Sequence, residues 1–136
     1  MHYITQPTSS PGLINTFICH CADCHKFTSS MFSSNFTIAD SHLTHLRGRA
    51  NLSAYTQARS VASGNTVTNH FCKTCGSLLY RTSSGYPGFS VLRVGTVDDF
   101  HLHEGKLRPG AEEFVVGRVG GLNEVEGAEQ SEGSSL

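Results

Sequence analysis

The order of apolar and polar residues along the chain predicts a series of short β-strands. Residues 13–18 are apolar and rich in β-branched side chains, and residues 31–38 alternate between apolar and polar positions. Such alternation is the period of a strand that is buried on one face. Further candidate strands follow at residues 43–46, 52–57, 66–72, 77–81 and 89–94. Short strands at intervals of about ten residues predict a mostly antiparallel, all-β domain.

Turn-forming residues separate these runs and support the same assignment. Gly, Pro, Asn, Asp and Ser favour the tight backbone conformations that connect strands. They occur in Asp40-Ser41, Arg47-Gly48, Ser63-Gly64-Asn65, Gly76 and Gly85-Tyr86-Pro87-Gly88. Residues 22–30 are an exception, because their sequence is compatible with one or two helical turns.

The two ends of the chain differ in composition from its middle. Residues 1–12 contain two Pro, two Ser and Gly12, which predicts a loose arm or an edge segment. Residues 119–136 are rich in Gly, Ser and Glu and offer little apolar surface to offset the entropy lost on ordering. We therefore expect one domain over residues 1–118 and an acidic tail over residues 119–136 that is flexible at its end.

Charge and hydrophobicity limit the classes of partner. Ten Lys and Arg stand against eleven Asp and Glu, for a net charge of −1. This balance provides no electrostatic attraction for nucleic acid or for an anionic membrane, so we expect neither as a partner. Residues 1–15 lack the basic and apolar regions of a secretion signal, and no run is long enough to span a bilayer. The expected location is the cytoplasm.

The five cysteines lie in two clusters. Cys19, Cys21 and Cys24 form the first, and Cys72 and Cys75 form the second. In a reducing compartment, clustered cysteines bind metal or perform redox chemistry more often than they form disulfides. A redox C-x-x-C pair needs a thioredoxin-like βαβ context, which the strand pattern does not provide. Metal binding is therefore the preferred interpretation of both clusters.

The spacing within the first cluster suits a single ion. Cys19 and Cys21 point to the same face of an extended strand, and a turn after Cys21 can fold Cys24 back over them. Three sulfurs can then converge on zinc at about 2.3 Å. In the second cluster, Gly76 follows Cys75 and permits the tight turn of a metal-binding knuckle. The alternative for the first cluster is a set of three buried core cysteines.

Three histidines next to the cysteines are candidates for catalysis. His20 lies between two ligands and faces away from them in a strand, which favours a role in the pocket or in orienting a ligand. His25 and His70 are candidates for a fourth ligand or for proton transfer. His101 and His103 lie between turn residues, where a solvated loop is expected.

Several stretches together resemble the family of glutathione-dependent formaldehyde-activating enzymes (GFA), which share a domain with a vertebrate centromere protein. The resemblance covers residues 14–118, and the end of the chain is similar to fungal members. It is carried by Cys19-His20-Cys21-Ala22-Asp23-Cys24-His25-Lys26, by residues 30–35, by residues 63–76 including His70-Phe71-Cys72-Lys73-Thr74-Cys75-Gly76, and by Gly95-Thr96-Val97-Asp98-Asp99.

The resemblance implies a fold and an activity. The fold would be a β-tent of small antiparallel sheets around cysteine-ligated zinc. The trio Cys19, Cys21 and Cys24 would hold a zinc near the glutathione site, and Cys72 and Cys75 would supply half of a structural zinc site. The expected partners are glutathione, as co-substrate, and a small aldehyde. A homodimer is a possible oligomeric state.

The sequence departs from the family at the other half of the structural site. Relatives carry an additional C-x-C on the first strand, whereas residues 1–18 contain no cysteine. A zinc with two thiolates is weakly held unless His or water completes it. Three explanations remain open: the second zinc is absent, one zinc is shared by both clusters, or the start of the gene has been lost.

Three functions follow as hypotheses. The first is a zinc-dependent carbon–sulfur lyase that acts on a glutathione or other thiol adduct of a small aldehyde, with His20, His25 or His70 moving protons. The second is a diverged metabolite-tailoring enzyme that handles a larger carbonyl compound. The third is a non-catalytic zinc module that binds another protein, for which a closed four-thiolate site is expected.

Overall fold

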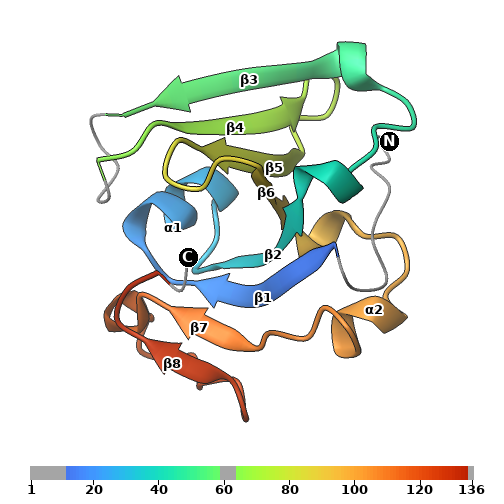
Figure 1. Cartoon of the computed structure of the whole chain (residues 1–136). Helices are drawn as coiled ribbons and strands as arrows, with labels where there is room; N and C mark the ends of the chain where they lie inside the picture. Colours follow the sequence, from blue (N-terminus) through green and yellow to red (C-terminus); the bar gives the residue numbers. More distant parts are fainter. Residues whose placement is uncertain (1–11, 59–63, 135–136) are drawn as a thin grey trace. The chain divides into compact units, whose positions relative to one another are not determined.

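The structure, a computed structural model, describes residues 12–58 and 64–134 and is mostly β. The described residues form eight strands and two short α-helices, joined by 3-10 turns (Figure 1). This confirms the all-β prediction. Within the described part of the chain, neither helix has the length and apolar character needed to cross a membrane.

The chain divides into two compact units. Unit 1 comprises Met1–Ile14 and Thr37–Leu92, and unit 2 comprises Asn15–Phe36 and Arg93–Leu136. The chain passes from one unit to the other within three strands, β1 (Leu13–Cys19), β2 (Ser33–Ala39) and β6 (Phe89–Arg93).

Unit 1 contains an antiparallel run of strands in the order β3-β4-β5-β6. In addition to β6, the run contains β3 (Leu52–Gln57), β4 (Val67–Cys72) and β5 (Leu78–Ser83), which lie side by side in Figure 1. Leu52 lies opposite Cys72, and the register of β4 and β5 shifts between His70 and Phe71. The predicted strands at residues 52–57, 66–72, 77–81 and 89–94 are confirmed. The buried apolar side chains of the unit include Ile38, Val67, Leu79, Tyr80, Val91 and Leu92.

Unit 2 has the strand order β2-β1-β7-β8. The strand β7 (Ala111–Glu113) pairs in parallel with β1, so that Cys19 lies opposite Glu113, and β8 (Glu129–Ser131) pairs in parallel with β7 (Figure 1). The helices are α1 (Ala22–Thr28) and α2 (His101–Glu104). The buried apolar side chains of this unit include Phe17, Ile18, Phe36, Val94, Val97 and Leu107.

Short 3-10 turns connect several of these elements. They are η1 (Asp40–His42), η2 (Arg49–Asn51), η3 (Val94–Thr96) and η4 (Val115–Gly117). The predicted turns at Gly48, Gly76 and Gly88 are left-handed, with φ of 76°, 73° and 84°. Glycine suits these positions because it has no Cβ to clash with the backbone.

Some predictions differ from the structure. The strand expected at residues 43–46 is wrong, because only an isolated bridge at His45 forms there and Leu46 is 65% exposed. The predicted loop around His101 and His103 contains α2. The segment read as a tail contains β8, whose pairing partner the sequence did not reveal. The predicted N-terminal arm falls mostly on residues 1–11, and the end of the tail on residues 135–136, which lie outside the described residues.

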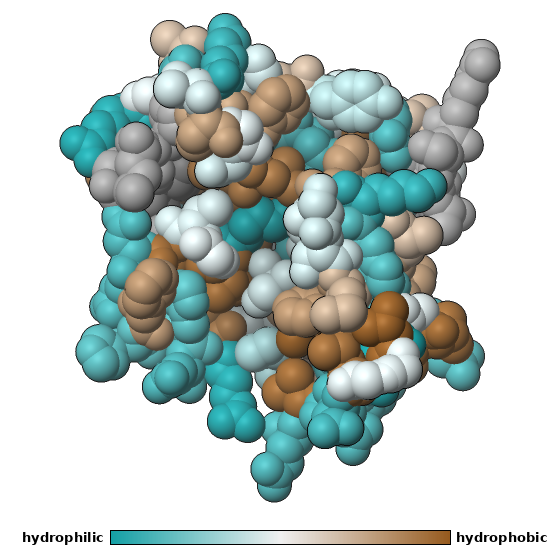
Figure 2. Space-filling model, turned by 180° about the vertical axis from the view of Figure 1, so that it is seen from behind, coloured by the Kyte–Doolittle hydropathy of each residue, from teal (hydrophilic) through white to brown (hydrophobic). Residues whose placement is uncertain are grey.

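The surface shows no broad apolar region on the face seen in Figure 2. Hydrophobic residues gather there in small groups that are interrupted by hydrophilic ones. Across the described residues, the exposed large hydrophobic side chains come from separate elements: Ile14, Met31, Leu46, Tyr55, Phe100 and Val116.

Candidate metal centre

Three cysteine sulfurs converge in unit 2. Cys19 ends β1, Cys21 immediately precedes the first helical residue, and Cys24 lies in the first turn of α1. Their Sγ atoms all lie within 4.8 Å of one another. Cys19 and Cys24 are buried, whereas Cys21 is partly exposed. We call residues 19–24 the cysteine loop.

The start of α1 brings these sulfurs together. Cys21 has extended backbone angles and caps the helix, because its Sγ accepts a hydrogen bond from the backbone N–H of Cys24 at 3.4 Å. The His25 N–H donates to the Cys21 carbonyl at 3.1 Å and begins the helical hydrogen bonding. A cap that folds the chain back by one turn therefore places the third sulfur over the first two.

The donor set fits a divalent metal such as zinc. Tetrahedral zinc with bonds of about 2.3 Å separates its sulfur ligands by about 3.8 Å, which is compatible with the observed grouping. Hydrogen bonding with the Cys21 and Cys24 sulfurs, together with burial, raises the pKa of Cys19 far above its usual range. Three crowded thiols therefore resist joint ionisation unless a cation compensates their charge. Among the described residues, no histidine or carboxylate joins the three sulfurs in this group.

His20 is buried between two of the candidate ligands and is held by β7. It is 2% exposed, and its backbone N–H donates to the Glu113 carbonyl at 3.0 Å. Its ring Nε2 lies 2.8 Å from Oε1 of Glu112. Its Nδ1 is buried and has no hydrogen-bond partner among the described residues. Among the described residues, His20 does not group with the three sulfurs, and its catalytic role stays a prediction.

Glu112 contacts His20, and the sequence alone did not single it out. It is 1% exposed, and its Oε2 accepts from the Val125 N–H and Gln130 Nε2, both at 2.8 Å, and from Arg118 Nη2 at 3.2 Å. Burial raises the pKa of this carboxyl, but the donors outweigh burial and lower the pKa to about 2. Nothing in a single sequence marks this glutamate, since its partner His20 is 92 residues away.

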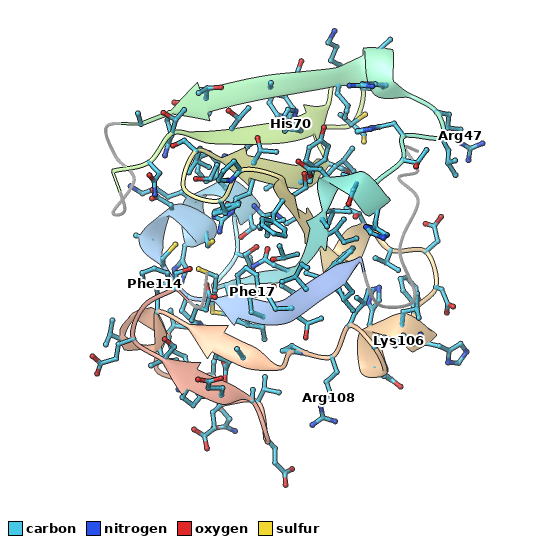
Figure 3. All side chains as sticks on the ribbon, in the orientation of Figure 1. Phe17, Arg47, His70, Lys106, Arg108 and Phe114 are labelled. Carbon is cyan, nitrogen blue, oxygen red and sulfur yellow. The ribbon has the colours of Figure 1, made fainter. Side chains whose placement is uncertain are left out.

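The turn after β7 packs against the cysteine loop. Phe114, labelled in Figure 3, follows β7 and has φ of 53°, a left-handed conformation that is uncommon for a residue with a Cβ. The chain then passes through η4 to Gly117, where an added Cβ would lie 2.4 Å from the His20 carbonyl oxygen. Only glycine fits this approach without movement of the backbone. The turn and β7 therefore both constrain His20.

The other two candidate histidines differ in position. His25 lies on α1 in the same unit as the cysteine loop, and its Nε2 is buried without a partner among the described residues. His70 lies on β4 in unit 1 (Figure 3), where its ring stacks on Tyr80 with centroids 4.3 Å apart. Burial and the nearby His45 lower the pKa of His70. The structure thus places two of the three candidates in the unit of the cysteine loop.

The second cysteine pair forms the predicted knuckle in unit 1. The Cys72 sulfur accepts from the backbone N–H groups of Thr74 and Cys75 at 3.3 and 3.4 Å and from Asn51 Nδ2 at 3.7 Å. Gly76 closes the turn by donating to the Cys72 carbonyl at 2.8 Å. Cys72 is buried and Cys75 is exposed. Their role as metal ligands stays a prediction, because no third ligand groups with them in the described residues.

The fold and the site define a small β protein with a candidate three-cysteine metal centre. The family of the glutathione-dependent formaldehyde-activating enzyme matches residues 4–117, and the chain belongs to this family. The chain is also similar to the crystal structure of a Rhodobacter sphaeroides protein, with 22% identity and a TM-score of 0.49 over 62% of this chain and 70% of that chain. A search of the curated proteins finds no match.

Proposed function

We propose that the protein is a zinc-dependent carbon–sulfur lyase that forms or cleaves the adduct of glutathione, or a related thiol, with a small aldehyde. Family membership supports a thiol-dependent reaction of an aldehyde. The observation that carries the proposal is the group of three sulfurs within 4.8 Å, to which no described residue adds a fourth ligand. Such a set leaves one tetrahedral position for a small molecule.

Cys19, Cys21 and Cys24 would hold the zinc. When bound, zinc supplies a positive charge that keeps a coordinated thiol deprotonated at neutral pH. In the synthetic direction, the thiol sulfur bonds to the aldehyde carbon, the carbonyl electron pair moves to oxygen, and the thiol proton ends on that oxygen. This transfer needs a group that accepts and returns one proton.

His20 is our preferred candidate for proton transfer. Its ring is buried next to two proposed ligands, and its Nδ1 has no partner among the described residues. His25 is the second candidate, because it lies one helical turn beyond Cys21 and its Nε2 also has no partner in the described part of the chain. His70 lies in unit 1, and its predicted role in proton transfer is tested by replacing it with alanine. Loss of activity in His70→Ala would support that role.

The cytoplasm is the proposed location. The five cysteines lie in two close clusters, and a reducing compartment preserves clustered thiols that bind metal.

The alternative keeps the fold but changes the chemistry, and is a diverged metabolite-tailoring enzyme that acts on a larger carbonyl compound. It is supported by the absence of cysteine from residues 1–18, where relatives are expected to carry a further C-x-C. The interaction module is favoured less, because a closed four-thiolate site would require a fourth ligand that the described residues do not group with the trio.

The proposed activity is tested by following adduct formation from glutathione and formaldehyde with ¹³C NMR. We expect the zinc-loaded protein to accelerate adduct formation or cleavage, and Cys21→Ser to abolish that acceleration. Cys75→Ser, outside the trio, is the matched control and should retain it. An equal rate with and without the native protein would contradict the proposal for formaldehyde. Acceleration with a larger aldehyde alone would favour the alternative.

A further inference from the structure

We propose that Glu112 is a positioning residue that accepts a hydrogen bond from Nε2 of His20, fixes the imidazole proton on that atom and leaves Nδ1 as a buried atom that needs a donor. The inference deepens the proposed function and rests on it for the role of Nδ1. The arrangement of the proton, in contrast, follows from hydrogen bonding within unit 2 alone.

The donors around Oε2 define the state of the Glu112 carboxyl group. Three N–H groups point at this oxygen, from Val125, Gln130 and Arg118. A proton on Oε2 would collide with these donors, so Oε2 carries none. The orientation of the Gln130 amide agrees, because its Nε2 also donates to the Ala128 carbonyl while its Oε1 accepts from Arg118.

The remaining oxygen faces His20. Oε1 of an ionised carboxylate can only accept a hydrogen bond, so Nε2 at 2.8 Å must be the donor. The low pKa of Glu112 agrees with ionisation, because its donors stabilise the charged form. A neutral imidazole with its proton on Nε2 has an unprotonated Nδ1.

Nδ1 is then a buried acceptor that lacks a donor. Folded proteins rarely leave such an atom unpaired unless a water or a ligand completes it. His20 cannot turn away easily, because its N–H is bound to Glu113 and its carbonyl is packed against Gly117. A buried carboxylate that fixes an imidazole tautomer serves the same purpose in serine proteases, where the corresponding amide lowers kcat by about 10⁴-fold.

This arrangement gives the segment after residue 118 a part in the site. Val125 and Gln130 provide two of the donors that hold Oε2, and both lie in the region that the sequence describes as an acidic tail. Residues 125 and 130 therefore act on His20 indirectly, through their hydrogen bonds to Glu112.

The Glu112→Gln substitution tests the proton arrangement directly. The amide oxygen should face the three donors and the NH₂ group should face His20, so that Nε2 becomes the acceptor and the proton moves to Nδ1. Two-bond and three-bond ¹H–¹⁵N correlations of the labelled imidazole distinguish the two tautomers. We expect Nε2–H in the native protein, Nδ1–H in Glu112→Gln, and no change in the exposed control Glu124→Gln.

Kinetics and zinc content then test the role of Nδ1. We expect Glu112→Gln to lower kcat by about 100-fold or more, with KM and zinc per chain close to native values. A native protein with Nδ1–H would overturn the inference even if the variant fails to fold. Unchanged kcat in a variant with the inverted tautomer would also overturn it. Absence of turnover in the native protein would contradict the proposed function, while the tautomer measurement would still decide how Glu112 acts on His20.

Discussion

Gly117 approaches the backbone carbonyl of His20 so closely that a Cβ at Gly117 would lie 2.4 Å from the carbonyl oxygen. The obstructing atom belongs to the backbone and cannot rotate away as a side chain could. The contact joins the turn after β7 to the centre of the cysteine loop. The identity of residue 117 therefore controls the position of residues that we propose to bind zinc.

The Gly117→Ala substitution should disturb both stability and metal binding. The methyl group must displace the His20 backbone, and overpacking of this kind costs about 1–3 kcal/mol. We expect a lower free energy of unfolding by urea denaturation and weaker zinc retention against a chelator. Gly120→Ala is the matched control, because nothing lies within 4 Å of its added Cβ. Equal stability of the two variants would contradict the close packing at Gly117.

Glu112 should make stability depend on acid pH. Its folded pKa of about 2 lies below its ordinary value of 4.5, so the unfolded state binds a proton more readily. The contribution of Glu112 is thus fully present above about pH 4.5 and is lost as the pH falls towards 2. Urea denaturation between pH 2 and 6 should show a shallower acid decline in Glu112→Gln than in Glu124→Gln. Parallel curves for both variants would show that Glu112 is not the group involved.

Cys75 should react with alkylating agents near neutral pH after metal is removed. Hydrogen bonds from the Ser77 side chain and backbone, and from Cys72, lower the pKa of Cys75 from 9.0 to about 7. In chelator-treated protein, we expect the alkylation rate of Cys75 to rise through about pH 7, and Ser77→Ala to move this rise to higher pH. Mass spectrometry identifies the labelled residue.

The same reaction tests the predicted metal at the second pair. If Cys75 is protected from alkylation before chelation and becomes reactive afterwards, Cys72 and Cys75 hold an ion. Equal reactivity before and after chelation would show that the pair is free of metal, as expected if the missing C-x-C has removed the second site.

Six strands could be predicted because their residues are apolar, β-branched or alternating and lie between turns. Residues 43–46 satisfied the same pattern and yet form no strand, since alternation does not provide a neighbour to pair with. The opposite error occurred at β7, where Glu112 and Glu113 are both buried and the apolar pattern of a strand is absent. Pairing with β1 and β8 stabilises this strand, and those contacts are distant in sequence.

The site was predictable to the extent that its chemistry is local. Cys19, Cys21 and Cys24 lie close in sequence, so their spacing alone indicated convergence. His20 was predicted from its strand position to lie outside the ligand group, and its role stays a prediction. Glu112 could not be found, since an isolated glutamate resembles a solvated surface residue until the distant donors that bury it are known.

Zinc content per chain tests the central claim most directly. Native protein purified with zinc, Cys21→Ser and Cys75→Ser are compared by mass spectrometry under non-denaturing conditions. We expect zinc in the native protein, the loss of one ion per chain in Cys21→Ser, and retention of the trio's ion in Cys75→Ser. A native protein without metal, or a Cys21→Ser variant with the native zinc content, would contradict the assignment of the three sulfurs as a metal centre.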